Sequence, residues 1–222
     1  MSTDAPKQLP RFLVATITHD GRCDMFYVNS LCESAKALLS HGIILAQVIY
    51  TAEDSIMMAT NRAITDAFNG EFDGLILVSP NVSWEPQALF DLINSNKDCV
   101  GLPVCTNTGF KVALGDPSRI HKDEQTGEVR VVGVTTDFLY LSGYAIKELC
   151  STHPTIKYLG VDVKLVLQSG DIFNAYLTVD EILNSRISEL NMEPWLNINH
   201  VVSSRNTTLS TGDFVQALNG LT

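Results

Sequence analysis

The chain has 222 residues, of which 45% are hydrophobic and 18% are charged, and this suits one well-packed α/β domain. The formal net charge is −10 at pH 7, and no cluster of lysines and arginines forms a phosphate-binding stripe. The balance therefore argues against unaided binding to nucleic acid. No apolar run is long enough to span a membrane and no signal-peptide pattern is present, so we expect a cytoplasmic protein that makes no membrane contact.

The first half of the chain alternates between apolar runs and helical spacing, after a polar arm over residues 1–10 that is predicted to be flexible. Short connections between such elements are typical of a parallel sheet with right-handed crossovers. The predicted order is strand 12–16, helix 25–41, strand 44–50, helix 55–68 and strand 74–78.

The second half is less regular. Residues 106–128 hold little apolar periodicity and predict a long loop or a hairpin, and residues 151–178 give no clear pattern. The elements predicted here are a helix capped by Ser83, strands at 99–103, 129–134 and 138–141, a helix at 145–150, a helix that opens at Thr178-Val179-Asp180-Glu181, and a closing strand at 195–202.

The most informative segment is Ser79-Pro80-Asn81, which follows the buried strand 74–78 and precedes Trp84-Glu85-Pro86-Gln87. Ligands of open α/β sheets bind at such strand-to-helix corners. The segment therefore marks the predicted binding site. Trp84 by itself suits a packing residue that fixes the loop.

Three stretches occur in an order and spacing that resemble small, single-domain GT-A-type glycosyltransferases of phages and large DNA viruses: Ala15-Thr16-Ile17-Thr18-His19-Asp20-Gly21, Asn61-Arg62, and the run from Leu77 through Trp84-Glu85-Pro86-Gln87-Ala88-Leu89. The likeness covers about residues 12–214. It implies an α/β fold whose mixed, mostly parallel sheet is flanked by helices, in one domain over 11–222. The nucleotide-binding half would span about 11–105, and the acceptor and catalytic half about 106–222. A viral enzyme of this kind would act in the host cytoplasm.

The resemblance also implies a nucleotide sugar as donor substrate and a set of residues that bind it. Asp20 is equally explained by an Asp-Gly turn, and Asn61 with Arg62 by a surface pair on a helix. Asp137 and Trp84 fall on the acceptor side. The donor-binding set is Thr16, Thr18, Asp20, Asn61, Arg62, Ser79 and Asn81.

Such enzymes usually carry Asp-x-Asp, which holds Mn²⁺ or Mg²⁺ and the nucleotide diphosphate, where this chain has Ser79-Pro80-Asn81. A hard cation prefers anionic oxygen ligands, so we expect weakened or absent metal dependence. Asn81 and His200 remain as candidate ligands, although a lone strand histidine is commonly a semi-buried structural residue. Asp137 either narrows the acceptor pocket or replaces a lost carboxylate. The cationic side chains in predicted loops, any one of which could supply the missing charge, are Lys111, Arg119, Lys122 and Arg205.

Sugar transfer needs a carboxylate base for the acceptor hydroxyl and positive charge for the departing diphosphate. The resemblance puts that base at Glu181, with Asp180 beside it. Acidic residues are also favoured in the first turn of any helix by its dipole, so the pair has a purely structural explanation as well.

Two further hypotheses use the same residues. The loss of both Asp-x-Asp carboxylates favours a catalytically silent homologue that serves as a partner subunit or binding module, which leaves a homo- or hetero-oligomer open. An acceptor on the hydroxymethylated bases of phage DNA is the third hypothesis, and the acidic net charge opposes it. The sugar, the acceptor and the stereochemical outcome are left open.

Overall fold

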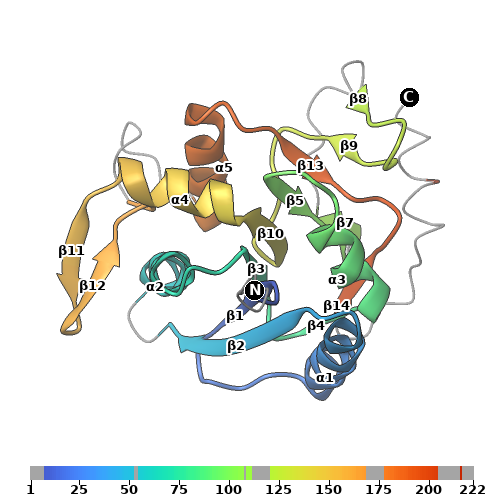
Figure 1. Cartoon of the computed structure of the whole chain (residues 1–222), viewed down its shortest axis with the longest axis horizontal. Helices are drawn as coiled ribbons and strands as arrows, with labels where there is room; N and C mark the ends of the chain where they lie inside the picture. The colour runs from blue at the N-terminus through green and yellow to red at the C-terminus, as the bar shows by residue number, and fades with distance from the viewer. Residues whose placement is uncertain are drawn as a thin grey trace, which may run out of the picture.

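The computed structural model describes residues 8–52, 55–107, 109–111, 121–168, 178–204 and 216. Residues 1–7 of the predicted arm, Arg119 and Arg205 lie outside these ranges. The centre of the molecule is a mixed sheet that brings together strands far apart in sequence (Figure 1). From one edge to the other its strands are β2 (Ile44–Thr51), β1 (Arg11–Thr18), β3 (Gly74–Val78), β10 (Phe138–Ser142), β5 (Cys99–Gly101), β13 (Pro194–Leu196), β9 (Val129–Arg130) and β8 (His121–Lys122).

Most strands of this sheet point in the same direction. β2, β1 and β3 are parallel neighbours, β10 runs antiparallel to both β3 and β5, and β5 and β13 are parallel again. β9 is the other reversed strand, because it pairs antiparallel with β13 and with β8. The predicted α/β class, with a mixed, mostly parallel sheet flanked by helices, is confirmed.

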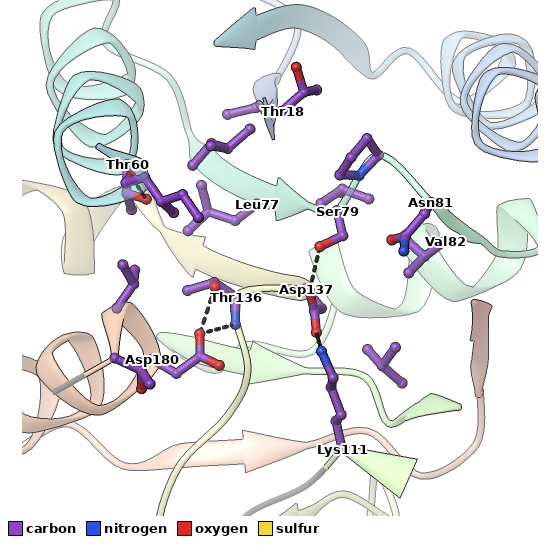
Figure 2. A pocket seen from close by; sticks show the side chains of 18 of the residues that line it. Thr18, Thr60, Leu77, Ser79, Asn81, Val82, Lys111, Thr136, Asp137 and Asp180 are labelled. Atoms are coloured by element: carbon purple, nitrogen blue, oxygen red, sulfur yellow. Dashed lines mark hydrogen bonds and ion pairs between the residues drawn. The ribbon is translucent and has the colours of Figure 1, made fainter. Parts of the chain in front are cut away.

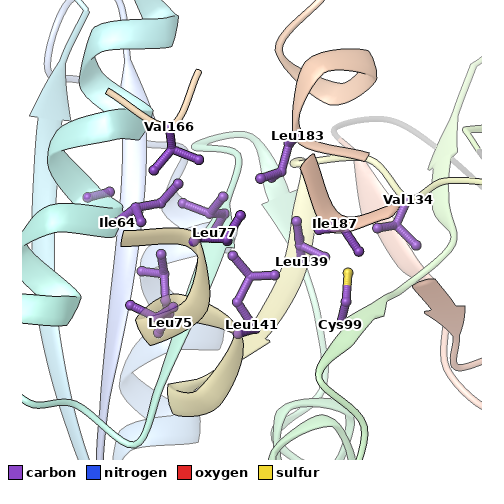
Figure 3. Packing of buried hydrophobic residues seen from close by; sticks show 14 of the residues in the cluster. Ile64, Leu75, Leu77, Cys99, Val134, Leu139, Leu141, Val166, Leu183 and Ile187 are labelled. Atoms are coloured by element: carbon purple, nitrogen blue, oxygen red, sulfur yellow. The ribbon is translucent and has the colours of Figure 1, made fainter. Parts of the chain in front are cut away.

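Helices cover both faces of the sheet because the central strands are apolar on both. The helices are α1 (Met25–Ser40), α2 (Ile56–Asn69), α3 (Pro86–Ile93), α4 (Gly143–Thr152) and α5 (Val179–Glu189). In β3, Leu75 and Leu77 pack with α2, α4 and α5, whereas Ile76 and Val78 pack with α1 and α3, and all four are at most 3% exposed. Figure 3 shows the first of these two cores. No helix in the described ranges is long and apolar enough to cross a membrane.

Two smaller sheets complete the fold. The region 151–178 contains a hairpin of β11 (Thr155–Tyr158) and β12 (Val161–Lys164), whose turn residues Leu159 and Gly160 both have positive φ, at 49° and 82°, as a tight hairpin turn requires. The other small sheet is formed, in order, by β4 (Val82–Ser83), β14 (Val202–Ser204), β6 (Val104–Thr106) and β7 (Gly109–Lys111).

Two local predictions are wrong. The closing strand predicted at 195–202 is two separate strands, because β13 pairs with β5 in the large sheet while β14 pairs with β6 in the four-stranded sheet. His200 lies between the two strands and belongs to neither. The helix predicted to be capped by Ser83 begins at Pro86 with Glu85 as its N-cap, because Ser83 belongs to β4 and proline suits the first helical position.

A carboxylate is buried just before β9. Glu128 is 1% exposed, and the Thr126 hydroxyl donates to its Oε2 at 3.0 Å. Burial raises the pKa of Glu128 above its ordinary value, although the Thr126 bond and the nearby charge of Lys97 oppose the rise. A raised pKa in the folded state contributes stability below the pKa of the unfolded chain, and that contribution is lost as pH rises through the folded pKa.

We therefore expect Glu128→Gln to raise the free energy of unfolding at about pH 8, where the wild-type carboxylate is ionised and buried. The gain should shrink as pH falls toward the raised pKa of Glu128, because the wild-type side chain then approaches the neutral form that glutamine mimics. Urea unfolding at several pH values measures the difference. A gain that stays constant across this range would contradict the explanation by ionisation.

Candidate functional site

A pocket of about 780 Å³ opens at the carboxyl ends of β1 and β3, the edge at which open α/β sheets bind ligands. The register of the strands decides which residues meet at this edge of the sheet. Thr16 of β1 pairs with Val78 of β3, and β10 enters from the other side with Phe138 opposite Val78. The residue that precedes β10 therefore lies beside the residue that follows β3. Polar side chains of the lining include Thr18, His19, Ser55, Thr60, Ser79, Asn81, Thr106, Lys111, Thr136, Asp137, Thr178, Asp180 and Ser204.

Asp137 is bound on both sides at this edge. The Ser79 hydroxyl donates to Oδ1 of Asp137, and the Ser79 backbone N–H donates to the Asp137 carbonyl at 2.8 Å. Lys111 Nζ, reaching in from β7, lies 2.7 Å from Oδ2, and the Thr135 hydroxyl donates to the same oxygen at 3.2 Å. Ser79, Asp137 and Lys111 thus form a continuous polar row along the pocket (Figure 2).

The charge of Asp137 is fixed by these partners. Burial alone would raise the pKa of this carboxyl, but the hydrogen bonds from Lys111 and Ser79 and the positive charge of Lys111 outweigh burial and hold the pKa below its ordinary value. Asp137 is therefore ionised at neutral pH, and its role in the pocket is that of an anion that binds a cation.

Asp180, in the first turn of α5, is the second carboxylate of the pocket. Its Oδ1 accepts from the backbone N–H of Thr136 at 2.8 Å and from the Thr136 hydroxyl at 2.6 Å. Since Thr136 and Asp137 are consecutive, the two carboxylates are held by one short segment before β10 (Figure 2). The bonds from Thr136 orient the Asp180 carboxylate, and Oδ2 is the oxygen through which it can accept from a ligand.

Two helices begin at the pocket. Ser55 precedes α2 and Thr178 precedes α5, and both residues line the cavity. The Thr178 hydroxyl accepts from the Glu181 N–H at 3.3 Å, whereas the Ser55 side chain makes no such cap bond. The N–H groups of a first helical turn carry partial positive charge and bind anions. The first turn of α5 carries Asp180 and Glu181, so the positive charge that the pocket offers to an anionic ligand group comes from the start of α2 and the ammonium of Lys111.

The structure brings part of the predicted site together. Thr18, Ser79, Asn81, Asp137 and Asp180 all line the pocket. They come from the end of β1, the loop after β3, the segment before β10 and the start of α5. The expectation that these four segments meet rests on their order in the chain, and their position at one edge of the sheet agrees with it.

Glu181 and Asp20 are directed elsewhere. The Glu181 carboxylate accepts from the backbone N–H of Thr178 at 2.7 Å and from the Thr178 hydroxyl at 2.9 Å, which closes a capping box. These two bonds lower the pKa of Glu181 and make it a weaker base. Asp20 is exposed and accepts from the Arg22 N–H at 3.1 Å, as expected of a turn.

Thr16 and Asn61 are structural residues of the interior. Thr16 is fully buried and its hydroxyl bonds the Tyr27 hydroxyl. Asn61 is fully buried in α2, where Nδ2 donates to the Leu167 carbonyl at 2.9 Å and Oδ1 accepts from the Leu167 N–H at 2.8 Å. Both backbone groups of Leu167, in the segment that follows β12, are therefore paired by the Asn61 side chain instead of by a neighbouring strand.

Arg62 and Trp84 also lie away from the lining. The Arg62 guanidinium carbon lies 5.8 Å from the centroid of the Tyr50 ring, on the side of α2 that faces β2. Trp84 is 6% exposed, and its indole N–H donates to the Ser34 hydroxyl at 2.9 Å. Trp84 thus fixes the loop after β3 against α1, which is the packing role that its sequence context suggests.

The residues that the structure describes do not fit a divalent-cation site. In the part of the chain that the structure describes, no group of three or more His, Cys, Asp or Glu side chains is placed to share a metal ion. His200 pairs through Nε2 with Oδ2 of Asp91 at 2.6 Å, away from Asn81 and the pocket lining. Both carboxylate oxygens of Asp137 already have partners.

The sequence does not single out Thr136, and it leaves Lys111 as one of four candidate cations. Threonine is unremarkable beside a strand, and only the register of β10 with β3 reveals that Thr136 faces Asp180. The sequence alone does not distinguish Lys111 from the other cations in predicted loops. The pairing of β6 with β7 does, because it places Lys111 opposite Val104, which lines the pocket. A predicted hairpin over 104–111 with this register would have identified it.

No protein-family model and no curated protein matches the sequence. Solved structures that are similar in arrangement include A197 from STIV, which aligns over 84% of this chain and 81% of its own with 12% identity and a TM-score of 0.48. GalNAc-T7, solved with UDP, GalNAc and Mn²⁺, aligns over 90% of this chain and 44% of its own with 8% identity and a TM-score of 0.45. The inositol-1-phosphate CTP transferase from T. maritima aligns over 96% of each chain with 10% identity and a TM-score of 0.44.

We expect Asn61→Ala to lower the free energy of unfolding by about 1–3 kcal/mol, because it leaves the buried N–H and carbonyl of Leu167 without partners. Asn69→Ala, on the exposed end of the same helix, is the matched control and should change stability by less than about 0.5 kcal/mol. Chemical denaturation measures both. Equal stability of the two variants would contradict the structural role of Asn61.

Proposed function

We propose that this chain transfers a sugar from a nucleotide-diphosphate sugar to a hydroxyl acceptor, with the donor bound in the pocket at the ends of β1 and β3. One observation carries the proposal: an oriented carboxylate, a lysine ammonium and two helix N-termini line the same cavity. Transfer from a diphosphate needs a base on one side of the reacting carbon and positive charge on the other, and these groups supply both.

The pocket suits such a donor in size and charge. A volume of about 780 Å³ falls within the range of cavities that enclose molecules of drug size. Thr18 and His19, at the end of β1, offer polar atoms to the nucleoside. The diphosphate is expected toward Lys111 and the start of α2, since both are positive and the rest of the protein is acidic.

Asp180 is the proposed base, in preference to Glu181. The acceptor oxygen attacks the anomeric carbon, the bond from that carbon to the diphosphate oxygen breaks, and the diphosphate leaves with the electron pair. The acceptor's proton passes to Oδ2 of Asp180, whose other oxygen is held by Thr136. Glu181 has its carboxylate engaged in the capping box and a lowered pKa, both of which oppose proton uptake.

A catalytically silent protein that has kept the pocket is the second candidate function. It is favoured by uncharged residues, Ser79 and Asn81, at both motif positions, and by the lack of a group of three metal-ligating side chains among the residues that the structure describes. Such a protein would act as a partner subunit or binding module.

Melting temperature with UDP, GDP and their common sugars, each in Mn²⁺, Mg²⁺ or EDTA, tests donor binding, because a ligand of the native state raises the melting temperature. We expect a nucleotide-dependent rise that survives EDTA. No rise with any nucleotide would reject the donor-binding proposal, and binding without any turnover would support the silent protein.

We further expect Asp180→Asn to reduce the rate of nucleoside diphosphate release from the donor by about 10²- to 10⁴-fold. Glu181→Gln is the matched control, because glutamine keeps the capping box, and it should stay within about threefold of wild type. Release can be measured with water or a mixture of sugars as acceptor. The opposite pattern, loss in Glu181→Gln alone, would move the base to Glu181.

A further inference from the structure

The row Ser79, Asp137, Lys111 occupies the place in the pocket where the resemblance expects a metal-binding carboxylate motif. Ser79 and Asn81 stand at the two motif positions, and neither carries charge. The carboxylate that does reach this place comes from Asp137, outside the motif, and it already binds a cation, the ammonium of Lys111. The structure thus pairs a carboxylate with a cation here, and the cation belongs to the chain.

The same atoms would make a poor binding site for a divalent cation. Mn²⁺ and Mg²⁺ take several hard oxygen ligands, preferably with more than one negative charge. The anion available at this place is Asp137, which offers its Oδ1 to Ser79 and its Oδ2 to Lys111 and Thr135. A metal would have to displace an ammonium held at 2.7 Å.

We propose that Lys111, held in place by Asp137, is the cation that binds the donor's diphosphate in this protein, in place of a divalent metal ion. The inference rests on the proposed function, since it assigns a residue to the diphosphate of that donor. It makes Lys111 a ligand-binding residue and makes Asp137 and Ser79 positioning residues that act through it.

The chemistry of an ammonium fits this role. Lysine carries three N–H donors, and the bond to Asp137 uses one of them, so the same nitrogen can also bind a phosphate oxygen. A lysine side chain normally loses rotamer freedom when it binds a ligand. The ion pair with Asp137 imposes much of that order beforehand, because Asp137 is itself held by the side chain and the backbone of Ser79.

The position of Lys111 also suits it to bind the donor's diphosphate. Its side chain is 56% exposed while that of Asp137 is 22% exposed, so the ammonium lies on the outer side of the pair, toward a ligand that enters from solvent. Figure 2 shows Lys111 rising from β7 toward Asp137. A partly exposed charge is screened by salt, so binding through Lys111 should weaken as ionic strength rises.

The test is calorimetric titration of the full chain with UDP or GDP, whichever raises the melting temperature, in EDTA and in Mn²⁺. We expect wild type to bind equally under both conditions, and Lys111→Ala to bind the nucleoside diphosphate about 10- to 100-fold more weakly, as for lost hydrogen bonds to a charged group. Lys122→Ala removes the same charge from β8, outside the pocket, and should bind as wild type does.

The ligand supplies a second control. Binding of the matching nucleoside, which lacks phosphate, should be the same in wild type and Lys111→Ala, and Lys111→Arg should retain most of the diphosphate affinity because it keeps the positive charge. A diphosphate affinity unchanged in Lys111→Ala, equal losses for nucleoside and diphosphate, or a wild type that binds only with Mn²⁺ would each overturn the assignment of Lys111. A wild type that binds no nucleotide would instead reject the proposed function itself.

Discussion

The antiparallel pairing of β10 against β3 is the contact on which the pocket depends. β3 is buried along its whole length and lies between two apolar cores, so its position is fixed by burial on both faces. The register of Phe138 opposite Val78 then leaves one arrangement for the residues just outside the two strands, with Asp137 beside Ser79 and Thr136 facing α5. A shift by one residue would turn each of these side chains to the opposite face of the sheet.

The parts of the fold that follow from local pattern could be predicted from the sequence. Continuous apolar runs identify β1 and β3, and helical spacing identifies α1 and α2, because burial against the sheet imposes these patterns directly. The division between β13 and β14 could not be predicted, since the apolar residues on both sides of His200 satisfy two different sheets. Only long-range pairing decides where the chain leaves one sheet for the other.

The residues of the candidate site also fall into those that could be placed from the sequence and those that could not. Residues that adjoin a predictable strand end, such as Thr18, Ser79 and Asn81, could be placed at the pocket from the sequence. Asn61 could not be separated from a ligand-binding residue, because the backbone of Leu167, more than 100 positions away, is what it binds. Asp180 and Glu181 are alike in type and adjacent in sequence, and only their partners, Thr136 for one and Thr178 for the other, distinguish a carboxylate in the pocket from a helix cap.

The ion pair between Lys111 and Asp137 also has a mechanical consequence. Lys111 belongs to the four-stranded sheet of β4, β14, β6 and β7, and Asp137 adjoins the large sheet. The loop Ser79-Pro80-Asn81 runs from β3 in the large sheet directly to β4 in the four-stranded one. The covalent loop and the ion pair therefore both link these two sheets, side by side along the pocket. An occupant that drew the ammonium toward itself would weaken the noncovalent link of the two and leave the covalent one in place.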